Sequence, residues 1–150
     1  MSTYDSTKDT LEHIRTVNKI MSKMVMEILS RMQNHDATKL RSPEKEIFDV
    51  YTPKLKGSTY GSYEYKLFLK EMKVALDNHY ALNTHHPESY TNGVNGMSLI
   101  DLIEMLCDWK AATERHADGS IEKSIMINKD RFSMSEQLVE IFQNTVKRFF

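Results

Sequence analysis

The sequence predicts an all-α fold: a compact, single-domain bundle of five to six helices over residues 1–150. Apolar residues recur at helical spacing in several long segments, and no segment shows the sustained two-residue alternation of a half-buried strand. A chain of 150 residues is long enough to bury a hydrophobic core in one domain. Residues 1–8 are polar and are expected to be flexible.

The first helix is predicted by apolar residues that recur three or four positions apart: Leu11, Ile14, Val17, Met21, Met24, Ile28 and Met32. This spacing is that of one helical face over about six turns. A short second helix is expected after Ser42-Pro43, because proline is tolerated in a first helical turn. Residues 54–62, "KLKGSTYGS", are predicted to form a loop.

The remaining segments complete the helical pattern. A middle helix is expected over residues 65–82, because Tyr65, Phe68, Met72, Leu76 and His79 share one face. Residues 85–96, "HHPESYTNGVNG", are rich in turn formers and predict a loop. Further helices are expected over residues 97–116, 120–130 and 133–149. The last of these would open with a capping box formed by Ser133 and Glu136.

Composition disfavours nucleic acid and membranes as partners. Twenty basic residues stand against twenty-one acidic ones, so there is no basic excess to attract a polyanion. The most apolar later stretch, "MSLIDLIEMLCDW", is interrupted by Asp101, Glu104 and Asp108, so no membrane span is expected. A single cysteine and a polar N-terminus favour a cytoplasmic location. A homo-oligomer is left open.

Histidine and aspartate residues occur in an order that suggests a metal site: His13 in the first helix, His35-Asp36 at its end, His79 late in the middle helix, His85-His86 in the next loop, and Asp108 in the helix that follows. Imidazole nitrogens and carboxylate oxygens are common ligands of transition metals. We expect one or two divalent ions, with Mn, Fe, Zn, Co and Ni all open. A metal-bound water would then be a nucleophile at neutral pH.

Several of these residues match a known pattern. The segment "HDATK" (His35, Asp36, Lys39) resembles the His-Asp motif of the HD-domain metal-dependent phosphohydrolases. The order His13, His35-Asp36, Asp108 is similar to the H…HD…D pattern of that superfamily, and "LIEMLCDWKAAT" resembles the helix that carries its last aspartate. The extra residues His79 and His85-His86 resemble the additional histidines of its two-metal branch.

The resemblance implies an HD-like helical fold and a phosphohydrolase that acts on a nucleotide or a related small phosphoester. It implies a primary site of His13, His35, Asp36 and Asp108. His79, His85 and His86 would complete a second metal site or position the substrate phosphate. The whole chain also resembles an uncharacterised family of small proteins found largely in bacteriophages. The location would then be the host cytoplasm.

Other residues are candidates for supporting roles. Lys39 is expected to counter phosphate charge and, with Asp36 and Glu88, to take part in catalysis; Glu88 would act as a general acid or hold a ligand in place. His86 and Arg115 are candidates for substrate binding. Asp101 and Glu104 share a helical face with Asp108, and they are expected to orient ligands.

Two other functions remain open, as do simpler roles for single residues. Asp36 alone is also typical of a helix cap, and His85-His86 alone could be polar loop residues. One alternative is a non-enzymatic factor that binds a nucleotide or a protein and carries a structural metal. The other is a di-iron enzyme that uses oxygen. A closed metal site would distinguish the structural role, because catalytic sites keep an open position.

Overall fold

The computed structural model describes residues 4–59, 62–115 and 119–150, and within these ranges every regular element is helical. The predicted all-α class is therefore confirmed for the described residues. They form seven α-helices, two of which replace one predicted helix: α1 (Thr7–Asn34), α2 (Glu44–Gly57), α3 (Tyr63–Glu71), α4 (Lys73–Leu82), α5 (Leu99–Thr113), α6 (Ile121–Phe132) and α7 (Glu136–Phe149). Three short 3-10 helices lie between them: η1 (Ala37–Leu40), η2 (Pro87–Ser89) and η3 (Gly93–Gly96).

The chain divides into two units. The first, Met1–His35, consists of α1 in its described part, and the second, Asp36–Phe150, contains every other element. The single domain expected over residues 1–150 stays a prediction. Of residues 1–8, expected to be flexible, residues 1–3 lie outside the described part, and α1 already begins at Thr7.

The extra helix arises at Met72, where the predicted middle helix is divided into α3 and α4. Met72 has φ −79° and ψ 1°, and its side chain is only 1% exposed. The change of direction lets both α3 and α4 contact α2. The apolar period runs in phase through this break, so periodicity alone could not reveal it.

Two further boundaries differ from expectation. Helix α2 continues through Pro53 to Gly57, so residues 54–57 of the predicted loop at residues 54–62 are helical. Helix α7 is capped by the Ser135 hydroxyl, which accepts a hydrogen bond from the Leu138 amide, and not by Ser133. Ser133 instead ends α6 in the left-handed conformation (φ 51°). Residue 116, the predicted end of α5, lies outside the described part.

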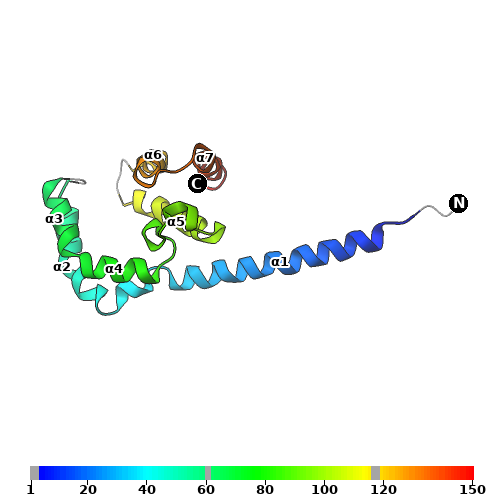
Figure 1. Ribbon diagram of the computed structural model, residues 1–150, viewed down its shortest axis with the longest axis horizontal. Helices are drawn as coiled ribbons and strands as arrows, with labels where there is room; N and C mark the ends of the chain where they lie inside the picture. Colours follow the sequence, from blue (N-terminus) through cyan, green and yellow to red (C-terminus); the bar gives the residue numbers. More distant parts are fainter. Residues whose placement is uncertain (1–3, 60–61, 116–118) are drawn as a thin grey trace. The chain divides into compact units, whose positions relative to one another are not determined.

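Within the second unit, the helices pack in two groups (Figure 1). Helix α2 contacts η1, α3 and α4, while α6 contacts α5 and α7. The hydrophobic core lies in the second group and is formed by Met105, Leu106, Ile121, Ile125, Met134, Val139, Phe142 and Val146. No described helix combines the length and apolar character needed to cross a membrane.

Candidate metal centre

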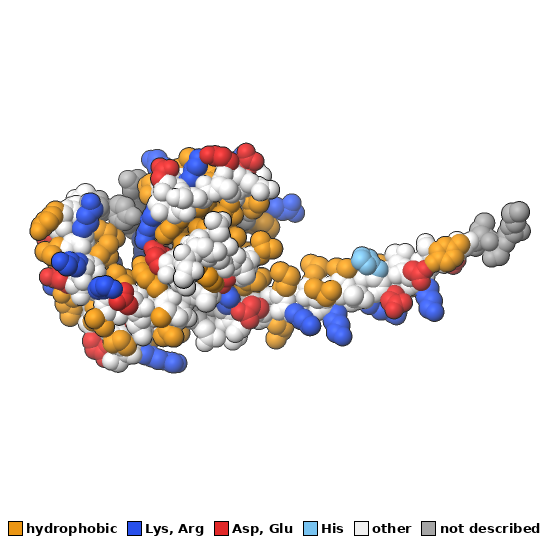
Figure 2. Space-filling view, viewed as in Figure 1, with side chains coloured by type: hydrophobic (Ala, Val, Ile, Leu, Met, Phe, Trp, Pro, Cys, Tyr) orange, Lys and Arg blue, Asp and Glu red, His pale blue; other side chains and the backbone are white. Residues whose placement is uncertain are grey.

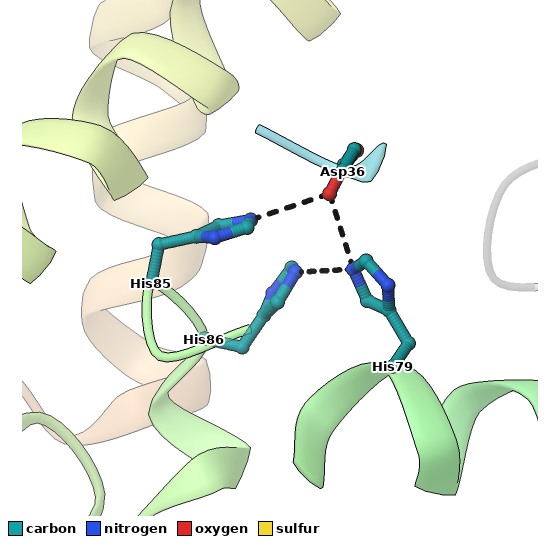
Figure 3. A group of neighbouring side chains, drawn as sticks. All are labelled: Asp36, His79, His85 and His86. Atoms are coloured by element: carbon teal, nitrogen blue, oxygen red, sulfur yellow. Dashed lines mark hydrogen bonds and ion pairs between the residues drawn. The ribbon is translucent and has the colours of Figure 1, made fainter. Parts of the chain in front are cut away.

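Four side chains of the second unit converge on one point: Asp36, His79, His85 and His86 (Figure 3). Each offers one ligand atom, and these atoms all lie within 4.8 Å of one another. The four come from three places: the start of the unit before η1, the last turns of α4, and the loop that follows α4. The cluster therefore brings together residues up to 50 positions apart.

Asp36 takes the place of a cap without acting as one. It precedes η1 in the left-handed conformation (φ 56°, ψ 14°), and its side chain makes no capping hydrogen bond. Its Oδ1 atom lies 3.2 Å from Nε2 of His79 and 3.6 Å from Nε2 of His85. The Lys39 ammonium donates to its other oxygen, Oδ2, at 2.6 Å. The carboxylate is thus directed to the histidine cluster.

His79 is held by a second, fully buried carboxylate. Its Nδ1 atom lies 2.9 Å from Oε2 of Glu44, and the two side chains are 2% and 0% exposed. A carboxylate accepts and does not donate, so the proton of a neutral His79 belongs on Nδ1 and the lone pair on Nε2. That lone pair is directed to Asp36. An imidazole fixed in this way by a carboxylate is the usual arrangement of a metal-ligating histidine.

Glu44 is itself fixed by neighbours that sequence reasoning did not single out. Asn78 donates to its Oε1 at 2.8 Å, and the Thr38 hydroxyl donates to its Oε2 at 3.0 Å. Asn83 in turn donates to the Thr38 hydroxyl at 2.9 Å. Glu44 was missed because an acidic residue just after a proline is typical of an exposed first helical turn. No local pattern signals its burial.

His85 repeats the arrangement of His79. Its Nδ1 atom lies 3.2 Å from Oε1 of Glu104 in α5, and its side chain is 2% exposed. Its Nε2 atom is the one that faces Asp36. The structure thus places Glu104 beside His85, and its predicted role in orienting ligands stays a prediction.

His86 completes the cluster from the same loop. Its Nε2 atom lies 2.9 Å from Nε2 of His79. Burial, followed by the effect of the neighbouring His85 and His79, lowers the pKa of His86 to about 3, and Asp108 and Asp36 oppose the shift. The imidazole therefore stays neutral, which is the form that binds a cation.

The loop that carries His85 and His86 is fastened to the start of α5 by Asp101. Thr84 donates to Oδ1 of this buried carboxylate at 2.7 Å, and Tyr90 donates to Oδ2 at 2.9 Å. Asp101 also forms a capping box with Ser98. It contacts the loop on both sides of the histidine pair, so its part in orienting ligands is indirect.

The donor set fits a divalent transition metal. Ligands bound at about 2.0–2.2 Å to a tetrahedral or octahedral ion lie about 2.8–3.6 Å from one another. Three separations fall in this interval: 2.9 Å between Nε2 of His79 and Nε2 of His86, and 3.2 and 3.6 Å from Oδ1 of Asp36 to Nε2 of His79 and of His85. All separations within the set are at most 4.8 Å. Three imidazoles and one carboxylate suit zinc, iron, cobalt or nickel better than a hard cation such as magnesium.

Asp108 and Lys39 lie beside the cluster. A carboxylate oxygen of Asp108, on α5, lies within 4.8 Å of one of Asp36, and its charge acts on the pKa of His86. Lys39 pairs with Asp36 and also lies over the Phe48 ring, 5.3 Å from its centroid. Both predicted residues are therefore at the site.

Glu88 has a different partner from the one expected. Its Oε1 atom accepts a hydrogen bond from Nη2 of Arg131, in α6, at 2.7 Å. Tyr80 lies beside both charges; burial raises its pKa, and so does Glu88, while Arg131 lowers it. The Tyr80 ring also lies 5.1 Å from that of His86. A cation and a phenol that the sequence did not indicate therefore border the cluster.

Two predicted residues, His13 and Arg115, belong to none of the groups of described residues that could hold a metal. His13 is exposed near the start of α1, and His35 directly follows the last residue of that helix. Their separation of 22 positions corresponds to a rise of about 33 Å, so His13 and His35 cannot bind one ion within the same chain while α1 is continuous. Arg115 is exposed just after the end of α5. The predicted set of His13, His35, Asp36 and Asp108 therefore cannot bind one ion as a whole, because His13 lies too far from His35 along α1.

Comparison with known proteins assigns the chain by family. The chain belongs to a family of unknown function, DUF5662, whose model matches residues 2–148. Neither the curated proteins nor the solved structures contain a match to the chain. The result agrees with the uncharacterised family that the sequence resembles, whereas the relation to HD-domain enzymes stays a prediction.

Proposed function

We propose that the protein is a metal-dependent phosphohydrolase that acts on a nucleotide or a related small phosphoester. Asp36, His79, His85 and His86 would hold the divalent metal, in an HD-like helical fold. The proposal extends the resemblance of His35-Asp36 and Asp108 to the HD-domain pattern.

One observation carries the proposal. Two histidines, His79 and His85, each place Nδ1 against a carboxylate and Nε2 against the same oxygen of Asp36. Such paired orientation is costly to build by chance, because it requires the carboxylates of Glu44 and Glu104 to be taken out of water. A cation between the three ligand atoms would stabilise the lone pairs that face one another.

The residues around the metal would each have a separate role in the reaction. When bound, a divalent cation would supply a water of lowered pKa and would offset charge on a phosphoryl oxygen. Asp36 would contribute negative charge to the site. Lys39 would balance phosphate charge from the side of Asp36, and Asp108 would accept hydrogen bonds beside it. Arg115, on the exposed end of α5, stays a candidate for distant phosphate contact.

A structural metal is the second candidate, and the number of ligands favours it. Four protein ligands are enough to close a tetrahedral site, as in structural zinc centres. An octahedral ion at the same ligands would keep two positions open for substrate or water. The coordination number therefore separates the enzyme from a non-enzymatic binding protein.

Metal analysis followed by an activity panel tests both candidates. Protein purified without a histidine tag should contain at least about half an equivalent of transition metal. The protein reconstituted with Mn²⁺ or Co²⁺ should hydrolyse a member of a panel of nucleotides and small phosphoesters, and Asp36→Asn should abolish the activity. The structural role would be favoured by bound metal whose absorption spectrum indicates four protein ligands and no open position, together with an absence of hydrolysis. Protein that takes up no metal would contradict both.

A further inference from the structure

Helix α1 carries an apolar stripe that nothing in its own unit covers. The described part of that unit is this one helix, which has 28 residues and therefore a length of about 42 Å. Figure 2 shows hydrophobic side chains along its visible face. Among the stripe's members, Leu11 is 47% exposed, Met21 57% and Val25 51%. An apolar stripe of this extent is typical of an interaction surface.

The stripe follows a heptad repeat. Counting Leu11 as position a, the a and d positions are occupied by Leu11, Ile14, Asn18, Met21, Val25, Ile28 and Met32. The steps between them alternate strictly between three and four residues over three heptads. Such alternation is the signature of a helix that packs against another helix in a left-handed coiled coil.

Asn18, the polar residue of the stripe, indicates how the helix pairs with its partner. Asn18 occupies an a position in the middle of the repeat, where a single asparagine commonly fixes register. In a parallel, in-register pair, each a residue faces the same residue of the other chain, so Asn18 faces a second Asn18 amide. In an antiparallel pair it would face a d residue, and all three d residues are apolar: Ile14, Met21 and Ile28.

We propose that α1 is the dimerisation helix of the protein and forms a parallel, in-register two-stranded coiled coil with α1 of a second copy. The amide pair at Asn18 satisfies both polar groups in this arrangement and in no shifted register, because the other a positions hold Leu11, Val25 and Met32. His13 occupies a c position and lies outside the seam. The proposal does not depend on the phosphohydrolase function.

The available surface is sufficient for a stable dimer. Each aliphatic side chain buries about 60–120 Å² of apolar surface when it is fully covered. Six apolar seam residues are flanked by Val17, Met24 and Leu29 at g and e positions. Nine such side chains supply about 540–1,080 Å² per chain, and a stable interface buries about 800 Å² per partner.

The test uses the full chain and its mass in solution. Sedimentation equilibrium should give a dimer, twice the 17.5 kDa of one chain. The double variant Met21→Glu, Val25→Glu should sediment as a monomer and keep its metal content, which shows that the second unit remains folded. Thr16→Glu, Ser30→Glu is the matched control, because these f positions lie opposite the seam, and it should remain a dimer.

Oxidative cross-linking tests the orientation. In a Cys107→Ser background, Met21→Cys should form a disulfide-linked dimer, because facing d positions bring two Cα atoms within reach of a disulfide. Lys23→Cys, at an f position, should not. A monomeric wild-type chain would overturn the proposal and assign the stripe to a contact within the chain. A dimer that Met21→Cys fails to link would overturn the parallel, in-register arrangement.

Discussion

The Nδ1 atom of His79 lies 2.9 Å from Oε2 of Glu44, a carboxylate that is 0% exposed. Burial of an acidic residue is costly unless it is hydrogen-bonded, and here the bonds serve to fix one imidazole. Replacement of Glu44 by glutamine would keep the shape and remove the charge. We expect Glu44→Gln to weaken metal binding about 10- to 100-fold, as measured by competition with a chelating dye. Glu46→Gln, exposed on the same helix, is the control and should bind metal as the wild type does.

Substitutions of Asp36 can separate an effect on backbone conformation from an effect on metal binding. Its φ of 56° lies in the left-handed region, which asparagine tolerates better than most residues. Asp36→Asn should therefore keep the melting temperature of the metal-free protein and lose most of the metal affinity. Asp36→Ala should lose the metal and also destabilise the metal-free fold by about 1–2 kcal/mol. Full metal content in Asp36→Asn would reduce this residue to a structural role.

His85 and His86 should respond unequally to substitution. His85 is buried and is held by Glu104, so His85→Ala would leave a cavity and a carboxylate without its imidazole. We expect it to lower metal affinity by more than about 100-fold, beyond the loss typical of an orienting residue, and to lower the melting temperature. His86→Ala should reduce affinity less and leave thermal stability closer to that of the wild type. Calorimetric metal titration and thermal unfolding of both variants would show equal effects if this ranking is wrong.

Glu88→Gln distinguishes an ion pair from a general acid. The carboxylate contacts Arg131, and the two side chains are 28% and 49% exposed. Partly exposed pairs of this kind contribute at most about 1 kcal/mol. We expect the variant to retain its metal and to keep its turnover within about threefold of the wild type for whichever phosphoester is cleaved. A loss of about 100-fold or more would restore the catalytic role that the sequence suggested.

Removal of the metal should destabilise the second unit. An ion that binds only the folded state adds about 2.7 kcal/mol at a free concentration 100 times its Kd. For a chain of this length, this corresponds to a fall of about 5–11 °C in the melting temperature after chelation. Thermal unfolding monitored by circular dichroism, with and without a chelator, measures the change. The Asp36→Asn variant should show no such difference.

The outcome at Met72 and at Glu44 shows where sequence reasoning reaches its limit. Helical periodicity identified the class of the fold and most helix positions, because apolar residues recur at helical spacing along each segment. It could not detect the break at Met72, since the apolar period continues in phase through α3 and α4. It likewise could not detect Glu44, because the burial of an acidic residue depends on partners such as Asn78 that are distant in the chain.

The sequence predicted the residues of the candidate site better than it predicted which of them lie close together. His79, His85, His86 and Asp36 were expected ligands, and the structure brings them together. His13 was added through the order of residues along the chain, and order carries no information on distance. Along the continuous 28-residue helix α1, the 22 positions from His13 to His35 correspond to a distance of about 33 Å.

One carboxylate, that of Asp101, accepts from both Thr84 and Tyr90 while it begins helix α5. The segment with the two adjacent histidines is therefore anchored at both of its ends to the same rigid body that carries Glu104. Its backbone amides should exchange with solvent only as fast as the first turn of α5 opens. Any molecule that reaches the cluster must then approach a preformed surface, and it cannot rely on this segment swinging aside to admit it.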